Sequence, residues 1–570
     1  MEKKWVIKSQ GDKDLVKRLS KELNINSTLT TLLVQRGITT YDEARIFFRP
    51  SLTMLHDPFL MKDMDKAIER IDHAIHNKEK ILIYGDYDVD GTTAVSLVYL
   101  FFKEYYEQIS FYIPDRNMEG YGISFKGIDW ANENGITLII ALDCGIKAND
   151  KIDYANKYGI DFIICDHHRP GEEIPNAIAV LDPKRSDCSY PYKELSGCGI
   201  GFKFLQGYVQ KHKMDFAVLE PYLDLVAVSI AADIVPITGE NRILAHFGLK
   251  QINRNPRAGI KAIIEVSGYK KEFTISDVVF TIAPRINAAG RIESGNKAVE
   301  LLISGKADLA KIIGDDINKN NTIRKSLDQD ITEQALALIT RDEKFLKRKS
   351  TVLYDPDWHK GVIGIVASRI LSDWYYRPTI ILTHSNGQVS GSARSVKDFD
   401  IYNAIESCSD LLEQFGGHMY AAGLTLKTEN VEAFRERFEE VVSSTIEDRM
   451  LVREIEIDAE IKFSDITQKF YNVLKQFAPF GPGNMAPVFK TTGVVDTGFS
   501  RLVGNKTTKH LKLTLKENGN ENAFEGIAFQ LGEHLLNVQK NKPLDICYHI
   551  EENNFRDETN LQLNIKDLQF

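Results

Sequence analysis

Three aspartates at alternate positions directly follow a short apolar run. Residues 81–84 precede Asp86, Asp88 and Asp90, and Gly91 with two threonines can then begin a helix. Three carboxylates this close together repel one another unless a cation lies among them. The spacing therefore predicts a divalent-cation site at the carboxyl end of a buried strand, which is where open α/β sheets build their active sites.

A calcium-binding loop is the first alternative, because Asp-x-Asp-x-Asp-Gly also begins an EF-hand loop. Counted from Asp86, the twelfth position of such a loop is Leu97, where an EF-hand needs a bidentate glutamate. An EF-hand also needs a helix before the loop, whereas residues 81–84 have the composition of a strand. The calcium loop is therefore excluded.

Three later apolar segments, beginning near residues 139, 162 and 225, also end in acidic or imidazole side chains. The residues that follow them are Asp143, Asp166, His167, His168 and Asp233. Oxygen-rich ligands with one or two imidazoles suit Mn²⁺ or Mg²⁺ better than zinc or copper. We therefore predict two divalent ions, preferably Mn²⁺ and otherwise Mg²⁺, which together clamp the attacking and leaving oxygens of a phosphoryl displacement.

The positions of these residues suggest their roles. Asp143 stands alone between the other sets, so it is the natural bridging ligand. Neighbouring side chains of an extended chain alternate in direction, and we expect His167 to be the ligand and His168 to support it or to contact the scissile phosphate. A metal site activates water, so no serine or cysteine nucleophile is required, and Cys144 is expected to be a buried small residue.

Composition limits the class of protein. The chain has 570 residues, 43% of them hydrophobic, and a formal net charge of −9. Its length predicts about three or four domains. The negative charge argues against a protein that coats nucleic acid but not against a nuclease with a local basic groove. The six cysteines show no Cys-x-x-Cys spacing, and with no secretory or membrane-spanning segment apparent we expect a cytoplasmic location and no membrane partner.

The fold class predicted is α/β. Strands and helices alternate from residue 80 to about 236, which indicates a mostly parallel sheet whose acidic ends meet at one edge. A parallel-sheet catalytic domain is followed by a long connecting helix, a second α/β domain and a C-terminal β-barrel. The expected boundaries are a helical extension at 1–50, the catalytic domain at 51–236, a helical region with the connecting helix at 237–350, the second α/β domain at 351–450 and the barrel at 451–570.

Local patterns give further expectations. An apolar stripe over residues 327–338 predicts the connecting helix. Residues 283–291 are interpreted as a glycine-containing, doubly basic turn, and residues 390–395 and 416–418 as small-residue turns with a polar tip. Within the barrel only one helix is evident, near residues 532–539.

These motifs together resemble the DHH phosphoesterase superfamily. Asp86-Tyr-Asp88-Val-Asp90-Gly matches its first motif, Asp143 its second, Asp166-His167-His168 the motif that names it, and Ala232-Asp233 its fourth. The resemblance implies that Asp86, Asp88, Asp143, His167 and Asp233 are metal ligands, with Asp90 a ligand or a support.

The resemblance extends beyond the catalytic domain. Residues 358–369, 390–394 and 415–418 are similar to a DHHA1-type domain, and residues 480–489 resemble the start of an oligonucleotide-binding (OB) fold. This combination implies a single-stranded-DNA-specific 5′→3′ exonuclease of DNA repair and recombination. The implied partners are single-stranded DNA, a single-strand-binding protein and a RecQ-type helicase, and the chain is expected to be a monomer.

The resemblance also assigns substrate contacts. Arg394 and Ser392, helped by Arg116 and Arg285, resemble a pocket for the 5′ end, because arginine binds phosphate through a fork of donors. His418 is expected to contact the phosphate near the metals, since glycines such as Gly417 let the backbone approach closely. Two further residues complete the predicted substrate-binding set, Arg291 and His359.

Two other functions share the metal motifs. One is hydrolysis of a small phosphate compound, such as pyrophosphate, a cyclic dinucleotide or a very short oligonucleotide; the barrel and the connecting helix favour a polymer instead. The other is a non-catalytic scaffold, which predicts broken metal motifs, whereas every acid is present in this chain.

Overall fold

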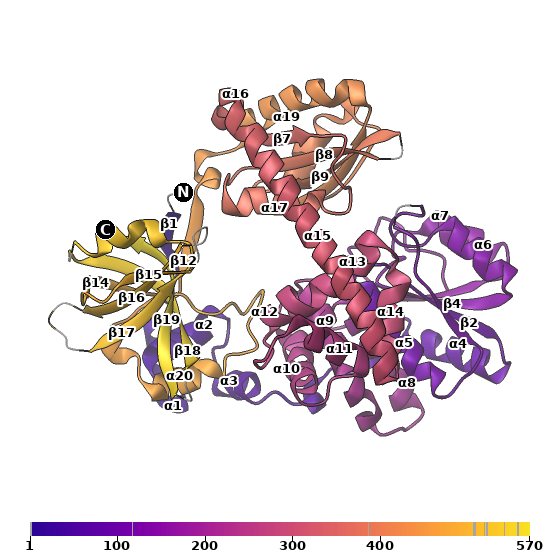
Figure 1. Ribbon diagram of the computed structural model, residues 1–570. Helices are drawn as coiled ribbons and strands as arrows, with labels where there is room; N and C mark the ends of the chain where they lie inside the picture. Colours follow the sequence, from indigo (N-terminus) through magenta and orange to yellow (C-terminus); the bar gives the residue numbers. More distant parts are fainter. Residues whose placement is uncertain are drawn as a thin grey trace.

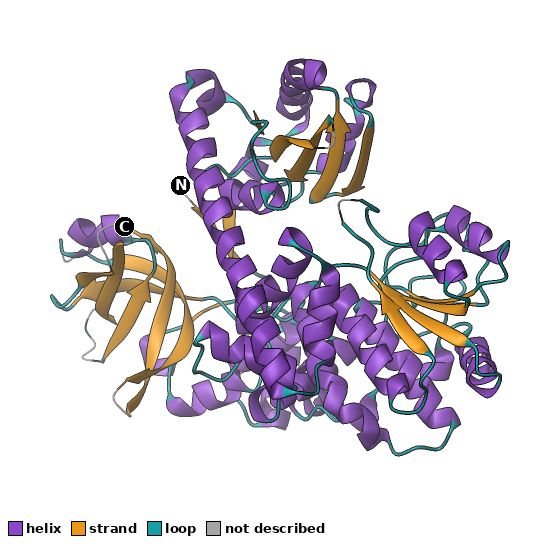
Figure 2. Ribbon diagram, turned by 45° about the vertical axis from the view of Figure 1, so that its right-hand side comes forward, coloured by secondary structure: helices purple, strands orange, loops and turns teal. Residues whose placement is uncertain are grey.

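The computed structural model describes residues 3–116, 118–385, 387–504, 509–517, 519, 522–540, 542–555 and 558–570. Figures 1 and 2 show three bodies: a large α/β body with many helices, a smaller α/β body and a barrel. The 35-residue helix α15 (Ala307–Arg341) runs from the first body to the second. The predicted α/β architecture with a connecting helix and a terminal barrel is confirmed.

The large body is built on a five-stranded parallel sheet in the order β3-β2-β4-β5-β6. Its strands are β2 (Lys80–Gly85), β3 (Ile109–Tyr112), β4 (Ile136–Leu142), β5 (Asp161–Cys165) and β6 (Ala179–Leu181). Alternate residues enter two different cores, Ile81 and Ile83 one, Leu82 and Tyr84 the other. Burial on both faces is typical of parallel sheets, and all five carboxyl ends lie at one edge.

Helices cover both faces of this sheet. The first core contains residues of α4 (Met64–His76), α5 (Val89–Lys103) and α8 (Gly197–Lys211), and the second contains residues of α6 (Phe125–Glu133) and α7 (Asn149–Asn156). The first core is one cluster of buried side chains whose members extend in sequence from Leu55 to Ile317. The helices after residue 236 therefore share the hydrophobic core of the sheet.

The helices after residue 236 include a segment that the sequence analysis interpreted as a turn. After α9 (Leu223–Ala232) they are α10 (Gly239–Arg254), α11 (Ala258–Ser267), α12 (Ile275–Asp277), the π-helix η4 (Val278–Ile282), α13 (Ala283–Ile292) and α14 (Gly295–Ile303). The turn predicted at 283–291 is wrong, because these residues form α13. The glycine serves helix packing instead: a Cβ on Gly290 would lie 2.8 Å from the carbonyl oxygen of Tyr87.

The second α/β body has a mixed sheet in the order β10-β11-β9-β8-β7. Its strands are β7 (Thr351–Tyr354), β8 (Thr379–Ser385), β9 (Gln388–Arg394), β10 (Gln414–His418) and β11 (Ala421–Leu426), and its helices are α16 (Glu343–Lys347), α17 (Ile363–Asp373), α18 (Ile401–Glu406) and α19 (Val431–Thr445). The turns predicted at 390–395 and 416–418 are wrong, since most of these residues lie in β9 and β10. Small residues there allow close packing, because a Cβ on Gly391 would lie 2.5 Å from Leu382.

The connecting helix α15 has the predicted apolar stripe. Of the predicted residues, Ile331 and Ala335 are buried in a core shared with α17, whereas Leu327 and Leu338 pack against it and are partly buried. Ile339, which was not predicted, is buried in the same core. One turn before Ile331, Asp328 is buried and forms an ion pair with Arg369 of α17 at 2.7 Å. The orientation of the second body is thus set by both apolar and ionic contacts with α15.

The barrel closes through pairing of β14 with β16. Its strands are β13 (Ala459–Glu460), β14 (Phe489–Asp496), β15 (Arg501–Gly504), β16 (Lys509–Glu517), β17 (Ala523–Ala528), β18 (Leu544–Phe555) and β19 (Glu558–Gln569). The expected helix appears as η9 (Gly532–His534) and α21 (Leu535–Val538). A second helix, α20 (Gln468–Lys475), corrects the expectation of one, and its buried face consists of Phe470, Tyr471 and Leu474.

The N-terminal extension packs on the barrel. Its helices α1 (Lys13–Leu23), α2 (Ser27–Gln35) and α3 (Tyr41–Phe48) were expected, and Leu29, Leu32 and Ala44 share the barrel's hydrophobic core. A strand that the sequence did not reveal, β1 (Lys3–Ile7), pairs with β12 (Arg453–Ile457). Within the described part of the chain, no helix combines the length and apolarity needed to cross a bilayer.

Candidate metal centre and phosphate pocket

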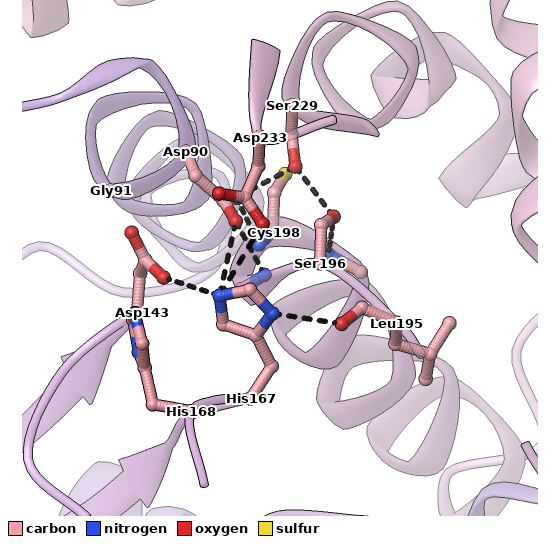
Figure 3. Close-up of polar contacts among 12 residues, drawn as sticks. Asp90, Gly91, Asp143, His167, His168, Leu195, Ser196, Cys198, Ser229 and Asp233 are labelled. Carbon is pink, nitrogen blue, oxygen red and sulfur yellow. Dashed lines mark hydrogen bonds and ion pairs between the residues drawn. The ribbon is translucent and has the colours of Figure 1, made fainter. Parts of the chain in front are cut away.

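Acidic and imidazole side chains from separate elements meet beside the sheet. The ends of β2, β4, β5 and α9 supply Asp86, Asp143, His167 and Asp233. Figure 3 shows Asp90, Asp143 and Asp233 around one nitrogen of the His167 ring, with Leu195 at the other nitrogen. The Nε2 atom of His167 lies 3.2 Å from Asp143, 3.6 Å from Asp233 and 3.8 Å from Asp90.

The His167 ring is held in the form that can bind a metal. Its Nδ1 atom lies 3.1 Å from the carbonyl oxygen of Leu195. A carbonyl only accepts hydrogen bonds, so Nδ1 carries the proton and Nε2 presents a lone pair to the acids. Burial lowers the pKa of His167, which favours the neutral ring. Orientation of a ligating histidine by a carbonyl is typical of metal sites.

The cluster has the electrostatics of a cation site. Among the described residues, the buried atoms Asp86 Oδ2, Asp143 Oδ1 and His167 Nε2 have no hydrogen-bond partner. Burial and the charge of Asp88 raise the pKa of Asp86 to about 8. Burial and the charges of Asp90 and Asp88 raise the pKa of Asp233 to about 8 and that of Asp143 well above its usual range.

Among the residues that the structure describes, two groups of three side chains bring their ligand atoms within 4.8 Å of one another. They are Asp143, His167 and His168, and Asp90, His167 and Asp233. The unpartnered buried atoms, the mutual repulsion of the carboxylates and the oxygen-rich donor set all fit Mn²⁺ or Mg²⁺.

The raised pKa values predict how pH and metal affect stability. In the metal-free protein, Asp86 and Asp233 bind protons up to about pH 8, whereas an unfolded aspartate loses its proton near pH 3.9. The protons bound by these two carboxyl groups therefore stabilise the folded protein fully below about pH 4, and this stabilisation is lost as pH rises through about 8. Mn²⁺ should replace these protons, so the increase in melting temperature that it causes should be larger at pH 8 than at pH 6.

Thermal unfolding with EDTA or Mn²⁺ at both pH values measures this effect. Ion at about 100 times its Kd adds about 2.7 kcal/mol, which corresponds to several degrees in the melting temperature. A larger increase at pH 6 than at pH 8 would contradict the predicted displacement of protons.

Asp90 supports the cluster. Its Oδ2 atom accepts from the amide of Gly197 (2.7 Å), and its Oδ1 atom accepts from the amide of Cys198 (2.7 Å) and the hydroxyl of Ser229 (2.6 Å). These bonds hold the first turn of α8 beside Asp143. Gly197 permits that approach, because a Cβ there would lie 2.6 Å from the Asp143 carboxylate. The geometry favours support over ligation for Asp90.

His168 is held separately. Its Nδ1 atom lies 2.8 Å from Asp166, which also accepts from the amides of His167 and Ile146. Burial opposes the charged ring, but Asp166 outweighs it and raises the pKa of His168 to about 9. The imidazolium lies beside Tyr121, whose hydroxyl is 3.3 Å from Nε2. A cation there suits contact with an anionic substrate.

Tyr121 was missed by sequence reasoning. Its hydroxyl also lies 3.3 Å from the carbonyl oxygen of Asp143. The signal available was its flanking pair of glycines, Gly120 and Gly122, which both have positive φ and mark a tight turn.

Four arginines, each from a separate segment of the chain, gather beside Asp88. Burial, followed by the charges of Arg116, Arg324 and Arg394, lowers the pKa of Arg291 to about 10. Arg291 also donates to the carbonyl oxygen of Gly361 at 2.8 Å, which joins α13 to the second α/β body. Cations this close repel one another, and an anion among them relieves that repulsion. Arg324, in the middle of α15, carried no sequence signal.

The other predicted pocket residues lie at different depths. Arg394 donates to the hydroxyls of Ser368 and Ser392, both at 3.1 Å, and burial lowers its pKa. Arg116 lies 4.9 Å above the ring of Tyr87. Arg285 is buried and donates to Asn318 at 3.0 Å. The Arg285 side chain therefore contacts other helical residues, whereas the side chains of Arg116 and Arg394 lie in the arginine cluster.

The two predicted histidines of the second body are exposed. The Nδ1 atom of His359 accepts from the amide of Gly361, next to the Arg291 contact. His418 pairs with Ala421 across the β10–β11 hairpin. Gly417 serves that hairpin, since a Cβ there would lie 2.4 Å from the Ala421 carbonyl oxygen. Contact of His418 with a phosphate stays a prediction.

Three family models match this arrangement. The DHH family N-terminal domain matches residues 80–230, the DHHA1 domain matches residues 347–444, and the RecJ OB domain matches residues 457–567. With the fold and the acidic cluster, these matches define the class as a DHH-family protein with DHHA1 and OB domains.

Relatives narrow this class. The single-stranded-DNA-specific exonuclease RecJ of Bacillus subtilis is 35% identical over 567 residues, covering 99% of this chain and 70% of that protein. The RecJ of Salmonella typhimurium is 32% identical over 531 residues, covering 89% and 90%. The crystal structure of Thermus thermophilus RecJ with Mn²⁺ has a TM-score of 0.85 at 25% identity and covers 100% of this chain and 79% of that one. The chain belongs to the RecJ family.

A second crystal structure of the Thermus thermophilus protein contains Mg²⁺. Mn²⁺ and Mg²⁺ are the two ions that the oxygen-rich ligand set of this chain fits.

Proposed function

We propose that this protein is a single-stranded-DNA-specific exonuclease that hydrolyses phosphodiester bonds in the 5′→3′ direction with two divalent ions. The observation that carries the proposal is the meeting of Asp143, His167 and Asp233 beside a cluster of four arginines, with the unpartnered carboxylate oxygen of Asp86 at the end of the neighbouring strand β2. Carboxylates that hold cations, next to guanidiniums that hold an anion, suit a phosphodiester and its terminal phosphate.

Separate groups of residues would bind the metal ions, bind the terminal phosphate and donate a hydrogen bond to the scissile phosphate. Asp86, Asp88, Asp143, His167 and Asp233 would hold two divalent ions, which supply an activated water and neutralise charge on the phosphate. Arg116, Arg291, Arg324 and Arg394 would bind the phosphate at the 5′ end. His168 would donate to an oxygen of the scissile phosphate, because Asp166 keeps its ring protonated.

The barrel would bind the rest of the strand. Phe499 and Phe529 are exposed by 72% and 55%, and His510 lies 5.1 Å from the ring of Phe529. Exposed aromatic rings on an OB fold provide stacking surfaces for successive bases.

Replacing Phe529 with alanine should weaken binding of a long single strand by about tenfold, since one stacked base contributes about 1–3 kcal/mol. Cleavage of a strand too short to reach the barrel should stay unchanged. Fluorescence anisotropy with oligonucleotides of increasing length measures the difference. Tyr158→Ala, which removes an exposed ring from the large body, is the matched control. Equal affinity of Phe529→Ala and the parent for long strands would remove Phe529 from the binding surface.

The biological setting belongs to the same proposal. We expect a role in DNA repair and recombination, with a single-strand-binding protein and a RecQ-type helicase as partners. Such proteins would supply and present the single strand that the exonuclease consumes. Sedimentation of the purified chain with each partner tests direct association.

End-labelled single and double strands of both polarities, with and without Mn²⁺, test the proposal. We expect mononucleotides to be released only from the 5′ end of single strands and only with the metal. Release from the 3′ end, or equal digestion of duplexes, would contradict it. A strong preference for a dinucleotide over a long strand would favour hydrolysis of small phosphate compounds instead.

A further inference from the structure

One loop of the barrel body contacts the segment of the large body that follows Asp233. The docking loop, residues 477–485, follows α20 and lies against residues 235–238 of the large body (Figure 1). The amide of Ile237 donates to the carbonyl oxygen of Pro482 at 2.6 Å. A Cβ on Gly481 would lie 2.5 Å from Ile237, and one on Gly483 would lie 3.0 Å from Thr238. The glycines therefore allow the backbone of the docking loop to lie against the side chains of Ile237 and Thr238.

A buried arginine fixes this contact. Arg242 of α10 is 6% exposed. Its guanidinium donates to the carbonyl oxygens of Phe477 (2.8 Å), Gln476 (3.2 Å) and Phe47 (3.2 Å). Gln476 and Phe477 follow the last residue of α20, where a cation is stabilised by the free carbonyls and the helix dipole. Arg242 thus joins the large body, the barrel and the N-terminal extension.

Asn484 fixes the docking loop from within. Its side-chain amide donates to the carbonyl oxygens of Phe477 and Pro479, both at 2.8 Å. Its Oδ1 atom accepts from Arg36 of the N-terminal extension at 2.7 Å. Asn484 is 2% exposed, so these bonds are shielded from water.

The docked segment, residues 235–238, begins two residues after the predicted metal ligand Asp233. Between them stands Ile234, which has a φ of 58° and is 64% exposed. A β-branched residue in the left-handed region is strained. Asp233 is fixed on one side by the end of α9, where its amide donates to Ser229, and residues 235–238 are fixed on the other side by the docking loop. The strain of Ile234 is therefore maintained from both sides.

We propose that docking of residues 477–485 positions the carboxylate of Asp233 through the strained backbone of Ile234, so that Arg242 and Asn484 are positioning residues for the metal centre. This proposal rests on the proposed function, because it assumes that Asp233 binds a divalent ion. If docking is lost, Ile234 relaxes to negative φ and turns Asp233 away from His167. Metal affinity then depends on a contact in the barrel body.

The test measures Mn²⁺ affinity of the full chain without DNA, by isothermal titration calorimetry. Arg242→Gln should weaken Mn²⁺ binding by about tenfold, the lower range for residues that orient ligands from outside the first coordination sphere. Asn484→Ala should also weaken Mn²⁺ binding. If Arg242→Gln fails to fold, Asn484→Ala is the test variant. Arg242→Lys should recover only part of the affinity, because lysine cannot make the forked contact.

A second substitution separates positioning from general destabilisation. Glycine adopts positive φ without strain, so Ile234→Gly alone should leave Mn²⁺ affinity unchanged. When Ile234→Gly is added to Arg242→Gln, the loss of Mn²⁺ affinity should shrink to less than about threefold. A double-mutant cycle detects this coupling. Thermal unfolding of each variant is measured alongside.

The matched control is Arg377, another arginine with 6% exposure. It donates to the Thr351 hydroxyl and the Arg348 carbonyl oxygen inside the second α/β body. Arg377→Gln should lower thermal stability and leave Mn²⁺ affinity unchanged.

Three outcomes would overturn the proposal. If the parent chain binds no Mn²⁺, the proposed function fails and this inference fails with it. If the parent binds Mn²⁺ and Arg242→Gln binds it within twofold of the parent, only the coupling fails. An equal loss of affinity in Arg377→Gln would show that lost stability, and not positioning, is responsible.

Discussion

Replacing Asp143 with asparagine should reduce Mn²⁺-dependent cleavage of single-stranded DNA by about a thousandfold or more. A bound ion contributes several kcal/mol of transition-state stabilisation, and each 1.36 kcal/mol is about tenfold in rate. Asn keeps the shape of the side chain and tolerates the φ of 61° found at this position. It removes the charge that we assign to the bridging ligand. Initial rates on a 5′-labelled strand measure the effect.

Folding can be judged in the same variant. The buried carboxylate of Asp143 is opposed by Asp90, Asp88 and Asp233, so the metal-free variant should be at least as stable as the parent at pH 8. Asp496→Asn is the matched control, because Asp496 is a buried acid of the barrel that accepts from Ser500. Cleavage by Asp143→Asn at the rate of Asp496→Asn would remove Asp143 from the mechanism.

Replacing Arg394 with alanine should abolish the preference for a 5′-phosphorylated strand over a 5′-hydroxyl strand. Arg394 is held by Ser368, Ser392 and its own strand beside Arg291. Hydrogen bonds to a charged group contribute about 1.5–3 kcal/mol each, so the loss on the phosphorylated strand should be about 10- to 100-fold. Competition between the two strands in one digestion measures this preference directly.

The control for this variant comes from the same body. Arg435 donates to the carbonyl oxygen of Val352 on the side of β7 and pairs with Glu432. Arg435→Ala should keep the preference for the 5′-phosphate. If Arg394→Ala retains the preference while the overall rate falls, the arginine cluster binds a different part of the strand.

The sequence predicted the metal cluster because its geometry follows from a simple rule. Parallel strands end at one edge of the sheet, so residues directly after β2, β4 and β5 must come together. Asp86, Asp143 and Asp166 occupy those positions, and His167 follows Asp166. Asp233 was found only because an apolar segment ended in an acid; that segment is a helix, and no strand rule places it at the same edge.

The remaining features depend on contacts between distant segments. The strand β1 forms only because β12, some 450 residues later, offers it a partner. The glycines of α13, β9 and β10 resemble turn residues in sequence, yet they serve close packing against Tyr87, Leu382 and Ala421. Arg324 shows no local pattern, because its significance arises only when α15 brings it beside Arg291.

The central claim is that Asp86, Asp88, Asp143, His167 and Asp233 hold two divalent ions at one edge of the sheet. Anomalous diffraction from crystals of the protein soaked in Mn²⁺ tests it most directly. The account predicts two peaks about 3.5–4 Å apart, both among these side chains, with Asp143 touching each. A map with no manganese among these residues, or with the ions bound elsewhere in the chain, would contradict it.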